Sequence, residues 1–592
     1  MHSACGRYVT VFNGEIYNFK TLRKELEGAG RSFTSRSDTE VLLTAVSQWG
    51  LFEAIKRLVG MFAFALWDKK EESLHLVRDR MGEKPLYYGW SGDAFLFGSE
   101  LKALRAHPAF QGEINRTALT LYLRHNYIPA PHTIFRNIYK LVPGTILSLP
   151  FKDYLNQKEP VPYWSVTDAI ARGKADLFHG SDADAIGQLE SLLKESVSNQ
   201  MISDVPLGAF LSGGIDSSTV VALMQSLSDR PVKTFTIGFR EQGYNEAEYA
   251  KEVARHLGTE HTELYVTARE ALEVIPKLPF LYDEPFSDSS QIPTYLVSQM
   301  TRRHVTVSLS GDGGDELFGG YSRYFLVANI LGSLDRIPRS LKKLGSRSIK
   351  MISPQTWDLF FNLIRPILPS RLKQPNPGNK LLKFAEIMNA GSVDEVYKIL
   401  VSHWQYPESI VIGGEEPSTW LSEMGSLKNL SNAEKMMALD MLTYLPDDIL
   451  TKVDRASMGV GLESRAPFLD HRLVEFAWRL PESLKIRNGQ GKWVLRQVLD
   501  RYVPHKLIDR PKAGFGVPID SWLCGPLRDW AENLLDENRL RKEGYFNPAP
   551  IRQKWAEHLA GSGNWQYHLW DILMFQSWLE ANSSKVEGGS SK

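Results

Sequence analysis

The sequence has very little cysteine, and this scarcity limits the compartment in which the protein works. Only Cys5 and Cys524 occur in 592 residues, so a framework of disulfides cannot hold the fold together. Such sparse cysteine usage is typical of proteins from a reducing compartment. We therefore expect a cytoplasmic protein.

The chain also lacks an excess of charge and a long hydrophobic run. Its 69 lysines and arginines balance 69 aspartates and glutamates, which removes the strong attraction of a basic protein to nucleic acid or anionic membranes and leaves room only for a local basic patch. No apolar stretch approaches the ~18 residues that indicate a membrane span, and residues 1–6 lack the cationic and apolar regions of an export signal. We expect neither a nucleic-acid nor a membrane partner.

What the sequence does contain is enough hydrophobic material for several packed domains. Hydrophobic residues make up 43% of the chain, and domains usually span ~100 to 200 residues. Residues 1–150 hold short runs rich in β-branched and aromatic residues, separated by polar or glycine-containing turns, with a helical pattern from Asp38 to Trp49. This mixture predicts an α+β domain.

The pattern changes after residue 150. Residues 151–183 have no steady period and contain Pro160, Pro162 and Gly173, which predicts a linker. From residue 184 apolar strands alternate with helical patterns, so residues 184–580 are predicted to form an α/β domain with a doubly wound parallel sheet and extra C-terminal helices. Residues 581–592 are too polar to pack and are expected to form a flexible tail.

Two glycine-rich turns in this second domain carry the chemistry. Residues 212–218 (SGGIDSS) lie directly between an apolar strand and a helix, and residues 310–321 (SGDGGDELFGGY) also follow an apolar strand. Ligands settle at the carboxyl ends of parallel strands, where glycine lets backbone N–H groups approach an anion and the next helix adds a partial positive charge. The first turn is predicted to hold a pyrophosphate group.

The acidic residues of these turns predict a magnesium site. Carboxylates beside a phosphate group repel it unless a divalent cation lies between them, and Mg²⁺ accepts hard oxygen ligands together with substrate phosphates. We therefore predict that Asp216 and Asp315 hold Mg²⁺. A plain loop is the alternative for either turn alone, but two such turns in the same strand-to-helix context favour a binding site over coincidence.

Two better-known site patterns do not fit. The Walker A pattern is absent, and residues 489–493 (GQGKW) lack its upstream glycine spacing and its Ser/Thr. Residues 312–315 (DGGD) lack the spacing of an EF-hand calcium loop. Neither a P-loop nor an EF-hand is predicted.

The motifs resemble those of a known family. Residues 212–218 resemble the pyrophosphate loop of the ATP pyrophosphatases, which adenylate a carboxyl or carbonyl oxygen. Residues 310–321, 444–458 (YLPDDILTKVDRASM) and 461–470 (GLESRAPFLD) narrow the resemblance to the asparagine synthetase family. It runs from about Gly6 to about Trp578, and motifs of this length are highly specific.

The resemblance implies roles for individual residues. Asp312 stands where the family has an acidic residue beside the β-aspartyl-adenylate, and Lys512 falls at the family's catalytic lysine. A fixed cation there stabilises the charge of adenylation most in the transition state, although a loop lysine is more often simply solvated. The residues implied to contact ATP are Leu211, Ser212, Gly213, Gly214, Asp216, Ser217, Ser218, Ile237, Ser310 and Gly311.

The first domain resembles another known unit. Residues 12–18 (FNGEIYN) and 37–40 (SDTE) resemble the glutamine pocket of the class II amidotransferases, which have an N-terminal nucleophile hydrolase fold. The resemblance implies that Asn13 and Gly14 form an oxyanion hole, the preorganised donor pair that a tetrahedral intermediate needs. It implies that Glu15 and Asp38 hold the backbone groups of glutamine.

The nucleophile of this family is a cysteine at the first mature position, whose own α-amino group acts as the base. Cys5 has four residues before it, so its α-nitrogen is an amide and accepts no proton. Residues 6–8 match the strand that leads into Asn13, a mid-domain element of the family, which implies a truncated amidotransferase domain. Two explanations stay open: the natural start lies upstream, or the chain has lost its glutaminase.

The sequence thus predicts an ATP-dependent asparagine synthetase that uses aspartate, ATP and glutamine or ammonia, requires Mg²⁺, and releases AMP and pyrophosphate. The glutaminase half is expected to be inactive in the chain as written, and a homodimer is compatible with the sequence. Two alternatives stay open: an amidotransferase that acts on a sugar acid or other carboxylate, and a non-catalytic nucleotide-binding relative. An ordinary charged helix face explains Asp454, Arg455, Glu463 and Arg465 as well as substrate contact does.

Overall fold

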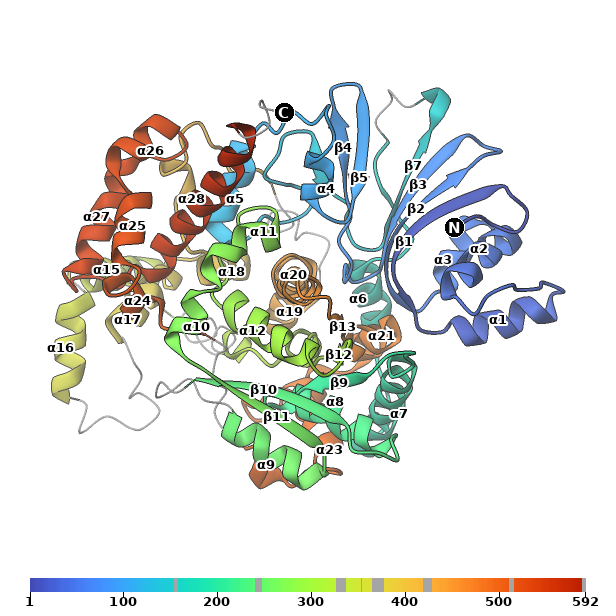
Figure 1. Cartoon of the computed structure of the whole chain (residues 1–592). Coiled ribbons are helices and arrows are strands. Elements are labelled where there is room, and N and C mark those ends of the chain that lie inside the picture. The colour runs from blue at the N-terminus through green and yellow to red at the C-terminus, as the bar shows by residue number, and fades with distance from the viewer. Residues whose placement is uncertain are drawn as a thin grey trace.

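The computed structural model describes residues 1–153, 158–239, 247–325, 337–352, 354–364, 377–418, 429–509 and 516–587. Within these ranges the chain forms an antiparallel α+β unit followed by a parallel α/β unit with many further helices (Figure 1). The predicted fold class is confirmed. Lys512 lies outside the described residues.

The N-terminal unit contains two antiparallel sheets. The first has the order β1-β2-β3-β7-β8 and the second the order β5-β4-β6. The strands are β1 (Tyr8–Ile16), β2 (Gly60–Asp68), β3 (Ser73–Arg78), β4 (Tyr87–Ser91), β5 (Ala94–Gly98), β6 (Ile138–Lys140), β7 (Thr145–Pro150) and β8 (Val161–Pro162). The helices are α1 (Phe19–Gly28), α2 (Asp38–Trp49), α3 (Leu51–Arg57), α4 (Leu101–Arg105) and α5 (Arg116–His125).

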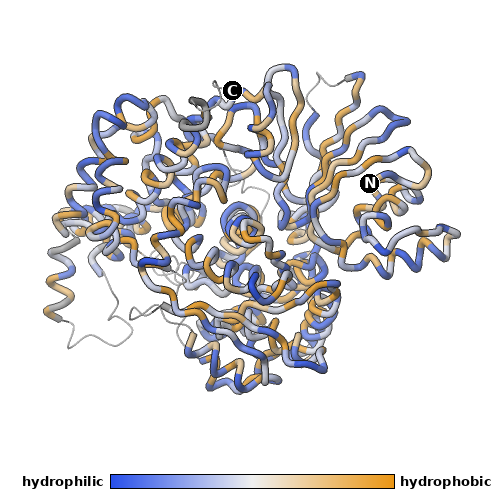
Figure 2. Tube along the Cα trace, in the orientation of Figure 1, coloured by the Kyte–Doolittle hydropathy of each residue, from blue (hydrophilic) through white to orange (hydrophobic). Residues whose placement is uncertain are grey.

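Alternation along β2 explains the layers of this unit. Phe62, Phe64 and Leu66 join a buried cluster with residues of α1 and α2, whereas Ala63 and Ala65 join a separate cluster on the other face with Leu147 and Leu149 of β7. A strand with a period of two buries both faces when helices cover one face and a second sheet covers the other. Figure 2 shows hydrophobic positions gathered along these strands.

Residues 151–183, which we expected to form a linker, contain β8, which pairs with β7, and helix α6 (Val166–Ala175). Helix α6 begins at the N-cap Ser165, whose hydroxyl accepts a hydrogen bond from Asp168 N. At the other end of the chain, α28 (Gln566–Glu587) continues past residue 581, and residues 588–592 lie outside the described part. The predicted domain boundaries themselves stay predictions.

The second unit is built on a parallel sheet of order β11-β10-β9-β12-β13. Its strands are β9 (Leu207–Phe210), β10 (Lys233–Phe239), β11 (Glu260–Val266), β12 (Val307–Leu309) and β13 (Glu463–Arg465). The helices on and around this sheet are α7 (Asp182–Gln200), α8 (Ile215–Ser226), α9 (Ala247–Leu257), α10 (Ala268–Leu272), α11 (Leu278–Tyr282), α12 (Gln291–Arg302) and α13 (Gly314–Phe318).

The remaining described chain is helical. Its helices are α15 (Arg339–Lys350), α16 (Pro354–Ile364), α17 (Pro377–Ile387), α18 (Val393–Val401), α19 (Asn432–Leu442), α20 (Thr451–Met458), α21 (His471–Arg479), α22 (Glu482–Lys485), α23 (Trp493–Leu499), α24 (Ile519–Cys524), α25 (Arg528–Leu534), α26 (Glu537–Glu543), α27 (Pro548–Leu559) and α28. Among the residues described, no helix is long and apolar enough to cross a membrane.

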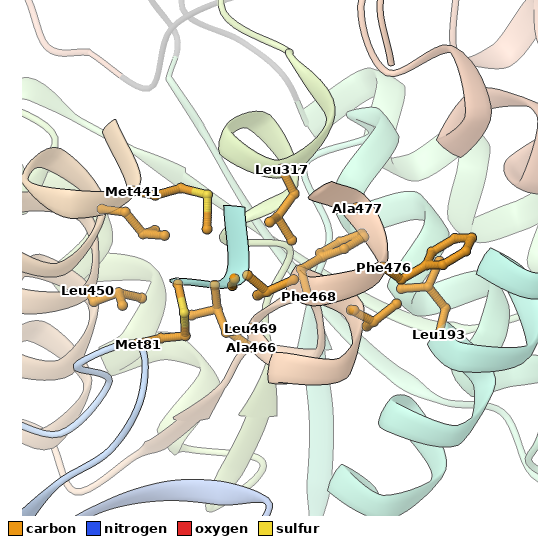
Figure 3. Close-up of a cluster of buried hydrophobic side chains, with 14 of the residues drawn as sticks. Met81, Leu193, Leu317, Met441, Leu450, Ala466, Phe468, Leu469, Phe476 and Ala477 are labelled. Atoms are coloured by element: carbon orange, nitrogen blue, oxygen red, sulfur yellow. The ribbon is translucent and has the colours of Figure 1, made fainter. Parts of the chain in front are cut away.

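The two units share one hydrophobic core. Met81 of the N-terminal unit packs in the same buried cluster as Leu450, Phe468 and Leu469 of the second unit (Figure 3). Helices α19 and α20 lie near the centre of the molecule in Figure 1. Shared apolar burial of this kind holds the units in a fixed relative position.

Buried charges cross the same boundary. Lys84 Nζ lies 2.9 Å from Asp454 Oδ1, and both side chains are buried. Arg455 donates to Ser99 O at 2.9 Å and lies 3.0 Å from Glu100 Oε1. Asp454 and Arg455 therefore join the two units and are not a solvated helix face.

Removing one charge of the buried pair should destabilise the whole protein. Lys84→Met leaves Asp454 ionised and unpaired, which costs about 3 to 5 kcal/mol. We expect a lower urea midpoint for Lys84→Met and recovery of at least half of the loss in Lys84→Met/Asp454→Leu, measured by tryptophan fluorescence. A double variant no more stable than the single one would contradict the pairing.

Candidate active site

The site lies at the point in the parallel sheet where the chain reverses the direction in which it adds strands. β9 and β12 are neighbours, but the chain leaves β9 toward β10 and β11 on one side, whereas β13 lies beyond β12 on the other. Such a switch point opens a crevice at the carboxyl ends of the two central strands. The turn after β9 holds residues 211–214 and the turn after β12 holds residues 310–313, so both predicted turns border this crevice.

The first turn is closed by its own serines. Ser212 Oγ lies 3.0 Å from Ser217 Oγ, and Gly214 N donates to Ser212 Oγ at 3.2 Å. Gly213 has φ +72°, and a Cβ there would lie 2.8 Å from Ala250 N of α9. Glycine is therefore required at this position both for its backbone conformation and for its packing. The turn leads straight into α8, so the N-terminus of a twelve-residue helix faces the crevice.

The second turn touches the first. A Cβ on Gly311 would lie 2.7 Å from Ser217 N and 3.0 Å from the carbonyl carbon of Asp216. A Cβ on Gly314, at the start of α13, would collide with the Asp216 carboxylate. Ser310 N donates to Arg465 O of β13 at 2.8 Å, which fixes the turn from its other side. The two turns thus form one wall of the crevice.

The carboxylates of the two turns converge on one lysine. Lys492 Nζ contacts Asp216 Oδ2 and lies 2.6 Å from Asp315 Oδ1. Burial alone would lower the pKa of the Lys492 ammonium, but Asp216 and Asp315 together raise it above its ordinary value. Lys492 is therefore a permanent cation between the two carboxylates that we predicted to hold magnesium.

Local backbone geometry holds Lys492 in this place. It is the residue before α23 and has φ +60°, a conformation that is uncommon for a residue with a side chain. Lys492 N donates to Phe318 O at 2.8 Å, at the end of α13. A Cβ on Gly491 would collide with Gly319 O, so glycine there allows the two backbones to touch.

A cavity of about 560 Å³ lies in front of these groups. Most of the predicted residues of this site line it: Leu211, Ser212, Gly214, Asp216, Ser217, Ile237, Ser310, Gly311, Asp312 and Asp315. Gly213 belongs to the first turn and Ser218 is buried behind it in α8, without lining the cavity. The volume lies within the range of small-ligand and cofactor sites.

Further charges lie deeper in the cavity. Lys452 Nζ pairs with Asp288 Oδ2 at 2.5 Å, and Tyr321 Oη donates to Glu316 Oε1 at 2.6 Å. Burial raises the pKa of the Asp312 carboxyl, and burial together with Asp315 raises the pKa of Glu316 to about 7. The cavity therefore offers both a cation and one carboxyl group, that of Glu316, able to hold a proton near neutral pH.

The donor set fits a magnesium ion shared with a substrate. Asp216 and Asp315 both reach a single cation, Lys492 Nζ, so their oxygens converge on one place. Within the described ranges no group of three or more His, Cys, Asp or Glu side chains is arranged to hold a metal alone. Mg²⁺ is usually held by one or two carboxylates together with substrate phosphates and water, which is what this pair provides.

The residues assigned by resemblance to glutamine binding also lie together. Asn13, Gly14 and Glu15 occupy the end of β1, and Asp38 Oδ2 accepts a hydrogen bond from Ile16 N at 3.0 Å. Asn13 Nδ2 donates to Ser99 Oγ at 3.0 Å. A Cβ on Gly14 would collide with Met61 O of β2.

These residues face the parallel sheet of the second unit. Glu15 Oε2 lies 3.9 Å from Arg465 Nη2, and Arg465 Nε donates to Glu463 Oε1 at 2.6 Å. The backbone carbonyl of the same Arg465 accepts the hydrogen bond from Ser310. One three-residue strand, β13, thus touches both candidate sites.

Cys5 lies away from the residues assigned to glutamine binding. Its Sγ is 3.3 Å from Ser3 Oγ and 3.7 Å from Ser47 Oγ. Ser47 is nine residues after Asp38 on α2, which corresponds to about 14 Å along the helix. Hydrogen bonds, that from Ser3 first, lower the pKa of the exposed Cys5 thiol, but Asn13 and Gly14 are at the other end of β1.

Sequence reasoning missed Lys492. We rejected residues 489–493 because they do not match a P-loop, and that rejection holds for the P-loop itself. The two glycines before the lysine were the available signal, since Gly491 lets the chain approach α13. Lys452 was missed as well, although it lies inside the motif at residues 444–458.

Gly311→Ala should disrupt the contact between the turns. The added methyl group would press on Ser217 N, so backbone must move and the pyrophosphate turn must open. We expect Gly311→Ala to lose most of the thermal stabilisation that Mg-ATP gives to the wild-type protein. Gly187→Ala is the matched control, because nothing lies within 4 Å of a Cβ at this helical position. An ATP-induced shift unchanged in Gly311→Ala would show that the turns do not depend on this approach.

Glu15 should make stability depend on pH. Burial, followed by the charge of Glu463, raises the pKa of its carboxyl from the ordinary 4.5 to about 7, although Arg465 opposes the shift. The Glu15 carboxyl thus stays protonated to a higher pH in the native state than in the unfolded chain. Its contribution to the free energy of unfolding is therefore fully present below pH 4.5 and is lost as the pH rises to 7.

Glu15→Gln is therefore expected to be more stable than the wild type at pH 8 and about equal to it near pH 4.5, in urea unfolding followed by fluorescence. The matched control is Glu53→Gln, which removes an exposed glutamate of α3. A stability difference between Glu15→Gln and wild type that is the same at both pH values would rule out the shifted carboxyl.

Comparison with known proteins agrees with this geometry. Residues 188–580 match the asparagine synthase family, and residues 1–164 match the glutamine amidotransferase domain family. The chain is 34% identical over 585 residues to asparagine synthetase [glutamine-hydrolyzing] 1 of Bacillus subtilis, covering 98% of this chain and 86% of that protein.

Two further relatives extend the comparison. The putative asparagine synthetase [glutamine-hydrolyzing] of Mycobacterium tuberculosis strain H37Rv is 33% identical over 97% of this chain and 84% of its own. Amidase chry2 of Gibberella zeae is 26% identical over 92% of this chain and 82% of its own. The chain therefore belongs to the asparagine synthase family, as a ligase with an N-terminal glutamine amidotransferase domain.

Proposed function

We propose that the protein makes asparagine from aspartate, ATP and ammonia through a β-aspartyl-AMP intermediate. The observation that carries this proposal is the convergence of Asp216 and Asp315, from two separate turns, on Lys492 at the mouth of a cavity of about 560 Å³. Acyl activation needs a site that binds a triphosphate and offsets the charge of the leaving pyrophosphate. The arrangement of Asp216, Asp315 and Lys492 supports both triphosphate binding and the offset of this charge.

The first turn is proposed to bind the phosphates of ATP. Its backbone N–H groups, the Ser212 and Ser217 hydroxyls and the N-terminus of α8 all border the crevice. Asp216 and Asp315 would hold Mg²⁺, which when bound offsets the negative charge of the phosphate oxygens. Lys492 would remain beside the pyrophosphate and stabilise the charge that develops as this group leaves. Lys512 keeps its proposed role by family resemblance alone.

The reaction then proceeds in two displacements. A carboxylate oxygen of aspartate attacks the α-phosphorus, the bond to the β-phosphate breaks, and pyrophosphate departs. Ammonia next attacks the acyl carbon, and AMP leaves with the carboxyl oxygen. The nitrogen loses a proton in this step, and Asp312 is proposed to accept it because its carboxyl lines the cavity.

We further propose that Cys5 is not the nucleophile of the amidotransferase domain. The Cys5 nitrogen is part of a peptide bond and so offers no base. Cys5 also lies at the opposite end of α2 from Asp38, beside Ser47. The proposed oxyanion hole at Asn13 and Gly14 is thus not served by this thiol.

The decisive experiment follows AMP and pyrophosphate release from Mg-ATP with aspartate and ammonium. We expect asparagine in equal amount to AMP with ammonium. Absence of AMP with every acid tested would overturn the proposed reaction.

Variants separate catalysis from folding in the same assay. Lys492→Met should lower the rate of pyrophosphate release about a hundredfold or more, because it removes a fixed cation from the transition state. Lys506→Met is the matched control, since Lys506 is exposed and does not line the cavity. Equal rates in both variants would remove Lys492 from the mechanism.

A second candidate is the same activation chemistry on another carboxylic acid. The similarity to Amidase chry2 favours this candidate, because the match covers 92% of this chain and the name of that protein gives a different activity. AMP release with another acid but not with aspartate would support this reading. The acceptor is therefore tested with a panel of acids at fixed ATP and ammonium.

A further inference from the structure

Helix α15 presents its apolar residues outward. Ser346 is buried against α17, where its hydroxyl donates to Ala385 O at 2.6 Å and accepts from Asn389 Nδ2 at 2.7 Å. At 100° per residue, Leu341, Leu344 and Met351 lie on the opposite side of the helix. They are 56%, 63% and 86% exposed. The helix thus packs with a polar face, and the described residues leave its apolar face uncovered.

Helix α16 also exposes large apolar side chains. Leu359, Phe360 and Leu363 are 72%, 50% and 80% exposed. Trp357 Nε1 donates to Ile349 O of α15 at 3.2 Å, which joins the two helices. Soluble proteins rarely leave so many large apolar side chains open on adjacent elements unless the surface has a partner. We call the six exposed side chains of these two helices the α15–α16 surface.

The charge beside this surface is strongly positive. Residues 337–364 contain five basic residues, Arg339, Lys342, Lys343, Arg347 and Lys350, against the single acid Asp358, in a chain whose formal net charge is zero. Asp358 is turned inward, where it accepts a hydrogen bond from Gly378 N at 2.8 Å. Lys343 and Arg347 are exposed along the stripe next to Leu344 and Met351. Lys350 is also exposed, and its Nζ lies 3.8 Å from Glu386 Oε1 of α17.

The partner must satisfy both the apolar side chains and the positive charge. A second copy of this chain would bring like charges together, which opposes association. A nucleic acid would match the charge but leave the leucines and Phe360 exposed to water. An anionic lipid surface matches both, because apolar residues enter the acyl boundary while lysine and arginine contact the headgroup phosphates.

We propose that the α15–α16 surface binds the face of an anionic lipid membrane without crossing it. The described helices include none long and apolar enough for a span, and α16 lies at the outer edge of the molecule in Figure 1, on the side away from α1. The binding surface is separate from the ATP cavity, which contains no residue of α15 or α16. This proposal departs from our expectation that the chain has no membrane partner.

The test is co-sedimentation of the 592-residue protein with vesicles. We expect binding to vesicles that contain phosphatidylglycerol, weakened by added salt, and little binding to vesicles of phosphatidylcholine alone. Lys343→Glu/Arg347→Glu should weaken binding at least tenfold, since each basic residue near an anionic surface raises the membrane affinity about fivefold. Leu344→Glu/Met351→Glu should abolish it, because both side chains are exposed and the change removes no packing.

Lys69→Glu/Lys70→Glu is the matched control, because it reverses two exposed charges in the turn between β2 and β3. It should bind as the wild type does, and all variants should keep wild-type ATP turnover. No binding to anionic vesicles, equal binding to neutral ones, or equal losses in the control would each overturn the proposal. A wild-type dimer that Leu344→Glu/Met351→Glu converts to a monomer would assign the surface to self-association and overturn it as well.

Discussion

The approach of Gly311 to the backbone of Ser217 is the contact on which the rest of the synthetase site depends. β9 and β12 are adjacent only because the chain reverses its direction of progress across the sheet between β11 and β12. That adjacency brings two turns within van der Waals contact, and the absence of a Cβ at Gly311 lets them close. Asp216 and Asp315, far apart in sequence, then face one lysine.

The electrostatics follow from that geometry. Two carboxylates in a buried crevice would repel each other and any phosphate. Lys492 offsets this repulsion from a third segment, and its backbone is fixed by Phe318 at the end of α13. The same crevice thus holds opposite charges in a small volume, which is a preorganised environment for a reaction that moves negative charge from the α-phosphate to pyrophosphate.

The sequence predicted the parts of this site that local chemistry determines. Residues 212–218 and 310–315 place glycine, serine and aspartate directly after apolar strands, so their position at the sheet edge followed from strand-to-helix order alone. Lys492 and β13 could not be predicted in this way. Lys492 lies just before a helix that is far from both turns in the sequence. β13 is only three residues long, which is too short for a periodic pattern to reveal it. Both reach the sheet by tertiary packing. The glycines before Lys492 indicate a close backbone approach in this region but not the segment that is approached.

The position of β13 in the sheet also has a consequence for the newly made chain on the ribosome. β12 gains its outer neighbour only when residues 463–465 have emerged, and the crevice gains its lysine only after residue 492. Until then Met81 lacks the apolar residues of the second unit that later pack against it, and Lys84 lacks its ion-pair partner Asp454. Nascent chains of intermediate length would therefore have an incomplete nucleotide pocket beside an exposed surface that is partly apolar and partly charged. Such chains would depend on chaperones to protect this surface from aggregation until synthesis ends.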